Sequence, residues 1–333
     1  MTRTRRLFEA LGPYAVLLLV LPVAALVAPG FYRTANLQNG VREASFLAVV
    51  ALGQLIVIIA RGLDLSVGAV ITTASLLIIE IAGRAGGRAL LGLIAVLIFG
   101  AAVGAVNAVM VAYRRVPAIL ATLATAVVVE GVVLWLTEGQ SRGRVPDLIR
   151  SMGTGRIGPV PVPVVIAAAA AVLVTLLLRR SAYGRSLYAV GSNPGASRFS
   201  GVPVRWISAS SFLLCSMLAV VAGLMLAGYV GFYDRTLGTG YELDSIAAVV
   251  LGGASLAGGR GTVGGTLAAA LGLAALDNLL LIRGVGEPFQ LIGKGLVLFL
   301  AVLFAQFILA PSRRSGGSTD NVGIPPERRE APA

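Results

Sequence analysis

The sequence predicts an all-α polytopic membrane protein with about ten transmembrane helices in a single bundle. Of its 333 residues, 57% are hydrophobic and only 13% are charged, whereas about a quarter of a soluble domain is charged. The mean hydropathy is +0.89. Apolar runs long enough to cross a hydrocarbon core of about 30 Å recur along the whole chain.

Ten apolar segments are candidate spans, and the third and eighth are short and rich in small residues, so we expect these two to be broken or re-entrant. The first follows a basic tail, residues 1–10; a cleaved signal peptide is the alternative, but Leu26 makes cleavage after Ala28 a poor small-residue site. The spans form one transmembrane domain, residues 11–310, followed by a polar tail, 311–333, that we expect to be disordered. In order, the predicted spans are Leu11–Ala28, Glu43–Ala60, Ser66–Ala82, Ala89–Tyr113, Pro117–Leu136, Val162–Leu178, Arg205–Val230, Leu243–Ala257, Thr262–Ile282 and Pro288–Ala310.

The distribution of arginine predicts the orientation. With the N-terminus in the cytoplasm, 16 arginines fall inside and 10 outside, and the single lysine, Lys294, lies in the last span. We therefore expect both termini in the cytoplasm of a bacterial cell, with the chain in the plasma membrane. The net charge of +12 is then explained by cytoplasmic loops that meet lipid headgroups, and we expect no nucleic-acid partner.

The composition excludes several kinds of chemistry. There is no histidine, and the only cysteine is Cys215, so we predict no catalytic residues and no metal site. The glycine-rich run Gly258–Gly265 has no following lysine, so the chain lacks a phosphate-binding loop. We therefore expect no bound cofactor, and any ATP and magnesium must be held by another chain.

Two stretches of the chain resemble each other. Residues 62–76 (GLDLSVGAVITTASL) and 242–256 (ELDSIAAVVLGGASL) match at six positions, including Asp64/Asp244. Each copy opens the third span of a five-span half, and an odd number of spans per half places the halves in opposite orientations. The sequence thus predicts the inverted repeat found in transporters, with the substrate path between the halves.

Polar side chains within the spans are candidates for that path. A neutral polyol needs amide, hydroxyl and carboxylate partners, and charged groups inside a membrane are costly. Two alternatives remain open: hydrogen bonds between helices, and capping of the following helix by Asp64 and Asp244 through backbone N–H groups. The predicted path residues are Asp64, Asn107, Thr122, Thr125, Asp244 and Asn278.

The stretch 179–205 is too polar to span the membrane and carries five arginines without an acid. Asn193 before Pro194 is typical of a helix start, and Gly201 with Pro203 of a helix end, so we predict a short helix over Pro194–Ser200. Such a short helix needs a surface to pack against. A protein partner fits this role; contact with anionic lipid is the alternative.

Four blocks of the sequence resemble the permease subunits of bacterial ATP-binding-cassette sugar importers of the ribose type. They are GLDLSVG at 62–68, residues 117–140, YGRSLYAVGSNPGASRFSGVPV within 179–205, and residues 238–284. The resemblance covers roughly residues 40–305.

This resemblance implies a transport subunit that is not itself an enzyme and that carries a monosaccharide such as ribose or xylose. The implied partners are a second permease copy or paralogue, a cytoplasmic ATPase and an extracytoplasmic sugar-binding protein. The short helix becomes the coupling helix that docks on the ATPase, and a bulky acid at Gly191 or Asn193 is expected to uncouple uptake. The predicted coupling residues are Gly184, Arg185, Tyr188, Ala189, Gly191, Asn193, Pro194, Ala196 and Gly201.

Two other classes remain as alternatives. A proton-coupled secondary transporter would use Glu80, Glu130 and Asp277 as carriers. An intramembrane serine enzyme would pair Ser255, in a near match to the G-x-S-x-G pattern, with Lys294.

Overall fold

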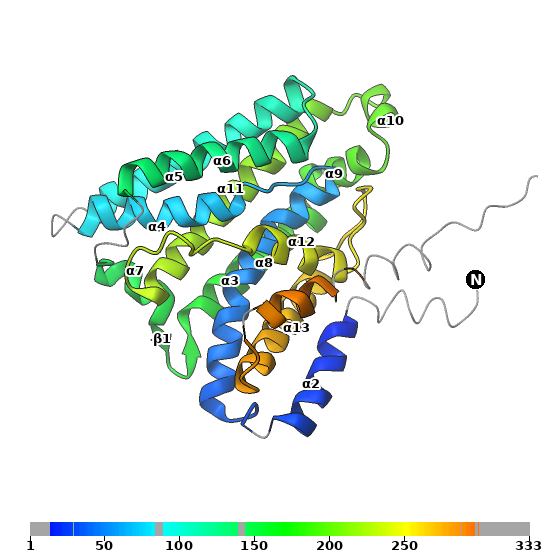
Figure 1. Cartoon of the computed structure of the whole chain (residues 1–333). Helices are drawn as coiled ribbons and strands as arrows, with labels where there is room; N and C mark the ends of the chain where they lie inside the picture. Colours follow the sequence, from blue (N-terminus) through cyan, green and yellow to red (C-terminus); the bar gives the residue numbers. More distant parts are fainter. Residues whose placement is uncertain are drawn as a thin grey trace, which may run out of the picture.

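The computed structural model describes residues 14–28, 30–83, 89–138, 144–286, 288–296 and 299. This part of the chain is helical almost throughout (Figure 1). The tails expected at 1–10 and 311–333, and most of the tenth span, lie outside the described residues.

The long apolar helices correspond to predicted spans. Among the described residues, six helices are long and apolar enough to cross a membrane, which makes the chain a multi-pass membrane protein. They are α3 (Thr34–Ile59), α5 (Ala89–Ala108, continued by the π-helical turn η2, Val109–Tyr113), α6 (Ala118–Thr137), α8 (Val162–Arg180), α11 (Val204–Val230) and α13 (Val263–Ile282).

The remaining spans are shorter. The first is α2 (Ala15–Val27), and residues 288–296 are helical at the start of the predicted tenth span. The expectation of short third and eighth spans is confirmed, because α4 (Val67–Gly83) has 17 residues and α12 (Tyr241–Leu251) has 11.

Three further elements were not predicted. They are α7 (Asp147–Thr154), an antiparallel hairpin of β1 (Arg156–Ile157) and β2 (Val160–Pro161), and α9 (Ala182–Ser192). Helix α7 packs on α11 through two glycines: a Cβ on Gly153 would overlap the backbone at Tyr229, and one on Gly228 would overlap the Ile149 carbonyl. Only glycine permits this approach at both positions, so α7 is fixed against the bundle.

Helix α3 forms the centre of the bundle. Every residue from Ala44 to Ile59 is buried, as expected for a helix that is apolar on all sides. It packs against α8, α11, α12 and α13. Glycines also bring α5 and α11 together, since a Cβ on Gly104 would lie 2.9 Å from the Cα of Leu213. Small residues commonly allow such close approach between helices in membranes.

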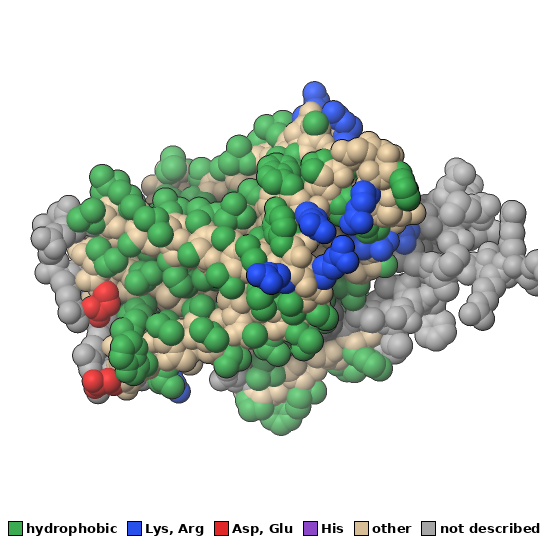
Figure 2. Space-filling view, turned by 90° about the horizontal axis from the view of Figure 1, so that it is seen from above, with side chains coloured by type: hydrophobic (Ala, Val, Ile, Leu, Met, Phe, Trp, Pro, Cys, Tyr) green, Lys and Arg blue, Asp and Glu red, His purple; other side chains and the backbone are tan. Residues whose placement is uncertain are grey.

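The two ends of the bundle differ in charge. Helices α9 and α10 (Pro194–Phe199) lie at one end, and α7 with the hairpin lies at the other (Figure 1). Hydrophobic side chains cover the flank seen in Figure 2, and basic side chains gather toward one end of it. In the part of the chain described, the exposed arginines at the α9–α10 end are Arg61, Arg114, Arg115, Arg179, Arg180, Arg185, Arg198, Arg205 and Arg260.

Candidate functional site

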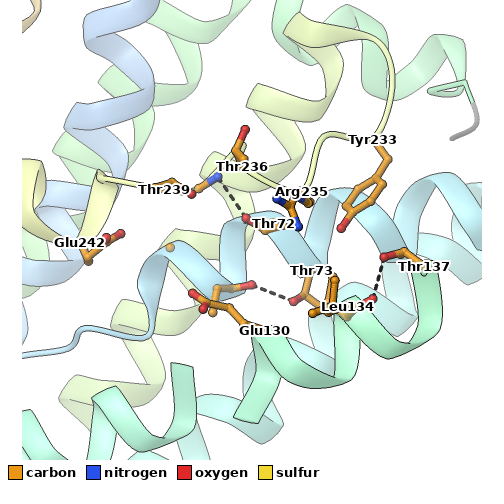
Figure 3. Close-up of a pocket in the computed structure, with 14 residues that line it drawn as sticks. Thr72, Thr73, Glu130, Leu134, Thr137, Tyr233, Arg235, Thr236, Thr239 and Glu242 are labelled. Atoms are coloured by element: carbon orange, nitrogen blue, oxygen red, sulfur yellow. Dashed lines mark hydrogen bonds between the residues drawn. The ribbon is translucent and has the colours of Figure 1, made fainter. Parts of the chain in front are cut away.

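A cavity of about 330 Å³ lies between α4, α6 and the segment that joins α11 to α12 (Figure 3). Its volume is within the range of small-molecule sites. Three parts of the chain far apart in sequence form its walls. The lining residues are Gly68, Ala69, Thr72 and Thr73 from α4, Glu130, Val133, Leu134 and Thr137 from α6, Tyr233, Arg235, Thr236, Gly238 and Thr239 from the joining segment, and Glu242 from α12.

The joining segment, residues 231–240, is held against α4 by its backbone. Gly238 N donates a hydrogen bond to the Thr72 hydroxyl over 3.0 Å. A Cβ on Gly238 would overlap the Gly68 carbonyl oxygen, and one on Gly68 would lie 2.7 Å from the Gly238 carbonyl oxygen. Glycine is therefore required on both sides of this contact, which sets the width of the cavity at its base.

The cavity lining is rich in hydroxyl and carboxylate groups. Glu130 is exposed near the middle of α6, and Glu242 lies in the first turn of α12. The Thr73 hydroxyl donates to the Ala69 carbonyl of its own helix at 2.7 Å, so it keeps oxygen lone pairs for another donor. The Thr137 hydroxyl donates to Val133 O at 2.8 Å. This arrangement suits a small polar solute better than a lipid chain.

A second hollow of about 220 Å³ continues the first toward the beginning of α6. The two share Ala69, Glu130 and Glu242, and the second also reaches Leu65 and Leu123. Because Leu123 lies in the second turn of α6 and Thr137 at its end, the hollows together follow most of this helix. We call the residues that line either hollow the α4–α6 groove.

Three of the predicted path residues meet in a buried group at the start of α4. The Asp64 carboxylate accepts hydrogen bonds from Ser66 N (2.9 Å) and the Ser66 hydroxyl (2.6 Å), and Asn107 Nδ2 donates to that hydroxyl over 2.8 Å. Thr122 Oγ1 accepts from Leu65 N at 3.1 Å. The Asp64 carboxylate thus forms a turn with Ser66, the residue before α4. Among the described hydrogen bonds it receives no backbone N–H of α4 itself, so its capping of that helix stays a prediction.

The other three lie elsewhere. Thr125 donates to Ala121 O within α6 at 3.0 Å. Asn278 on α13 exchanges hydrogen bonds with Asn36 on α3, at 2.8 and 3.2 Å, and so joins two helices. None of the six predicted path residues lines the α4–α6 groove.

The capping role expected for Asp244 is wrong. Its backbone N already bonds Gly240 O at 2.9 Å, which places it inside the first turn of α12, and Gly240 occupies the capping position. The Asp244 carboxylate instead lies 2.9 Å from Lys294 Nζ, which is also 3.0 Å from Asp277. A lysine inside the membrane is thus paired with two carboxylates, and it joins α12, α13 and the helical residues 288–296.

The sequence patterns did not identify most of the residues that line the groove. Of its polar lining, only Glu130 was singled out, as a proton carrier. The paired threonines Thr72 and Thr73 within a helix, and the threonines at 236 and 239 after Tyr233, were the available signals. They were ambiguous because threonine within a helix commonly bonds its own backbone.

The α9–α10 segment, residues 181–203, forms the basic end of the bundle. The predicted short helix is confirmed as α10, which begins at Pro194 and ends at Phe199. The Asn193 side chain accepts from Ala196 N at 3.0 Å, as its capping position requires. Ser181 caps α9 in the same way by accepting from Gly184 N at 3.0 Å.

The predicted coupling residues divide into two groups. Gly184 and Gly191 are buried, and the Tyr188 hydroxyl donates to Gly261 O at 2.8 Å, so these three fasten the segment to the bundle. Burial raises the pKa of the Tyr188 hydroxyl, which keeps it a donor at neutral pH. The others face outward or toward the rim: Arg185, Ala189, Asn193, Pro194, Ala196 and Gly201. Next to them lies Phe199, which is 95% exposed and which sequence analysis did not select.

A family model described as the permease component of branched-chain amino acid transport systems matches residues 36–310. This chain belongs to that permease family. The match covers every helix from α3 to α13, and therefore the whole groove and the α9–α10 segment of the permease.

Individual relatives cover almost the same range. The ribose import permease protein RbsC of Escherichia coli (strain K12) is 39% identical over 86% of the permease and 90% of that protein. RbsC of Haemophilus influenzae (strain ATCC 51907 / DSM 11121 / KW20 / Rd) is 34% identical over 89% and 92%. The L-arabinose ABC transporter permease protein AraH of Azospirillum brasilense is 28% identical over 91% and 89%.

These relatives confirm the resemblance to ribose-type permeases and the interpretation of the chain as a transport component and not an enzyme. No solved structure matches the permease. The geometry also gives no support to a serine enzyme, because Lys294 is engaged by Asp244 and Asp277 and is not presented to Ser255.

Proposed function

We propose that the permease is the membrane-spanning subunit of an ATP-binding-cassette importer that moves a monosaccharide or a similar polyol across the bacterial inner membrane. An extracytoplasmic sugar-binding protein delivers the substrate, and a separate cytoplasmic ATPase binds ATP and magnesium and drives the cycle. The α4–α6 groove is the observation that carries this proposal. Its first hollow offers hydroxyl and carboxylate partners to a neutral polyhydroxylated solute, and the second, mostly apolar hollow continues it along α6.

The groove also supports a dimer. Carboxylates facing lipid cost about 2.5–3.5 kcal/mol each on insertion scales, and Glu130 is exposed on the side of α6 that lines both hollows. A second copy or a paralogue laid over this side would turn two grooves into one water-filled path. Exposed Val127 lies one turn before Glu130 on α6 and would pack against that partner.

The packing of the helices supports two halves in inverted repeat. Helices α4 and α5 pack on α11, and α12 and α13 pack on α3, while α3 and α11 contact each other. When the predicted spans are numbered from one to ten, spans three and four pack on span seven. Likewise, spans eight and nine pack on span two. Exchanging the halves reproduces the pattern, as a pseudo-two-fold relation requires.

The charge at the ends supports the orientation. Exposed arginines without an exposed acid mark the α9–α10 end of the described chain, so we place that end, and with it both termini, in the cytoplasm. There the exposed Phe199 and the basic rim of the α9–α10 segment present an apolar anchor and positive charge to the ATPase.

Reconstitution in proteoliposomes with the ATPase and the binding protein tests the proposal. We expect sugar uptake that requires ATP and all three components; uptake driven by a pH gradient without the ATPase would contradict it. Thr73→Val should lower uptake about fivefold, the effect of about 1 kcal/mol from one lost hydrogen bond. Thr175→Val is the matched control, because Thr175 makes the same bond within α8, to Ala171 O at 2.7 Å, outside the groove.

A further inference from the structure

Three segments of the permease meet at one point beside the basic end of the bundle. The end of α3 bonds the loop between α12 and α13, because Ile59 O accepts from Gly259 N at 2.9 Å. The end of α9 enters the same contact, since a Cβ on Gly191 would overlap the Ile59 carbonyl oxygen. These backbones approach so closely that a displacement of α9 must also displace Ile59.

The Arg61 side chain joins the end of α3 to the end of α9 by hydrogen bonds. Its Nε donates to Gly191 O at 2.7 Å, and its guanidinium also donates to Ser192 O at 2.9 Å. Both acceptors are carbonyls in the last turn of α9, where a positive charge is favoured by the helix dipole. Arg61 reaches them from a left-handed backbone conformation, with φ at +69°, which is unfavourable for a residue other than glycine.

The residues directly after Arg61 lead to the α4–α6 groove. Leu63 O and Leu65 N both bond Thr122 of α6, at 3.2 and 3.1 Å. Asp64 and Ser66 are fixed to Asn107 of α5, and α4 begins at Val67. The first groove residue of α4, Gly68, is therefore seven residues from Arg61, and the linker between them is held by hydrogen bonds.

We propose that Arg61 is the positioning residue that transmits movement of the α9–α10 segment to α4, and so to the width of the α4–α6 groove. This inference rests on the proposed function, in which the ATPase moves the α9–α10 segment. The guanidinium supplies the attachment: two charge-assisted hydrogen bonds join α9 to the linker, and the linker carries α4 with it.

The test uses the full complex of permease, ATPase and binding protein in proteoliposomes. Arg61→Gly removes the guanidinium and relieves the left-handed strain, so a defect does not come from added backbone strain. Arg61→Lys keeps the charge but loses the forked pair of donors. Arg115→Gly is the matched control: Arg115 is also exposed at this end with φ at +60°, and no described hydrogen bond or ion pair involves its side chain.

Uptake per ATP hydrolysed is the first measurement. We expect Arg61→Gly to lower this ratio at least about fivefold, the lower range of coupling between sites. Arg61→Lys should recover part of the loss, and Arg115→Gly should match the unmodified permease. An unaltered ratio in Arg61→Gly, an equal loss in Arg115→Gly, or failure of Arg61→Gly to bind the ATPase would each overturn the inference.

A thiol reporter in the groove gives the second measurement. Leu134→Cys in a Cys215→Ala background places one thiol on the half-exposed groove wall. ATP should change its labelling rate in the unmodified complex and leave it constant with Arg61→Gly; a change that persists would overturn the inference. Absence of ATP-driven uptake by the unmodified permease would instead contradict the proposed function, so the two failures are distinguishable.

Discussion

Gly238 and Thr72, 166 residues apart in sequence, are joined by a hydrogen bond of 3.0 Å between the Gly238 N–H and the Thr72 hydroxyl. The bond is buried, and it closes the base of the cavity by fixing residues 231–240 to α4. A backbone N–H inside a membrane protein must find an acceptor, because no lipid group supplies one. Thr72 is thus at once part of the groove wall and the acceptor that keeps the joining segment in place.

Replacing Thr72 tests that role. Thr72→Val preserves shape but leaves the Gly238 N–H without an acceptor, at a cost of about 1–3 kcal/mol. We expect a lower thermal midpoint in detergent and weaker sugar uptake. Thr72→Ser keeps the hydroxyl and should remain close to the unmodified protein; loss in Thr72→Ser with none in Thr72→Val would show that the methyl group, and not the bond, matters.

Gly191 should not tolerate any side chain. Even Gly191→Ala places a Cβ against the Ile59 carbonyl oxygen and 2.5 Å from Gly259 N, so we expect poor expression or a clearly lowered midpoint. The uncoupling expected from a bulky acid here is therefore inseparable from a folding defect. Gly195→Ala is the contrast, because its Cβ would meet only Asn193 Oδ1, at 3.3 Å. Similar stability of the two variants in a thermal unfolding assay would contradict this close packing.

Whether a feature could be predicted from the sequence depends on how far apart in the chain the interacting residues lie. Span positions depend on local hydropathy, and α10 depends on Asn193 and Pro194 beside it, so most of these ends were predicted to within a few residues. Two were not: α3 begins at Thr34, nine residues before the predicted Glu43, and α12 ends at Leu251, six residues before the predicted Ala257. The turn at Asp64 is also local, since its partner Ser66 is two residues away.

The groove depends on contacts that no local pattern encodes. Gly68 and Gly238 meet only because α4 and the joining segment lie side by side in the folded bundle. Asp244 resembled Asp64 in the repeat, but its partner Lys294 is 50 residues away. Sequence similarity between the repeats therefore predicted the position of Asp244 in the fold and not its interaction.

Asn193 should contribute to docking through the helix it caps. Asn193→Ala removes the acceptor for Ala196 N and destabilises α10 by about 0.5–2 kcal/mol. Because α10 is only six residues long, we expect weaker binding of the ATPase with membrane insertion unchanged, measured by co-purification in detergent. Asn193→Asp and Asn193→Ser retain a capping oxygen and should bind more tightly than Asn193→Ala; equal binding by all three would contradict the capping role.

Lys294 should be essential for the packing of the C-terminal helix. Lys294→Met leaves Asp244 and Asp277 as two carboxylates without their shared cation inside the membrane, and removal of one partner from a buried pair costs about 3–5 kcal/mol. We expect a strong fall in the thermal midpoint in detergent, and partial recovery when Asp244→Asn and Asp277→Asn are added, because the combined variant contains no unpaired charge. Lys294→Arg should keep most of the stability. If the triple variant is no more stable than Lys294→Met alone, the effect of Lys294 comes from its hydrocarbon chain and not from its pairing with the two aspartates.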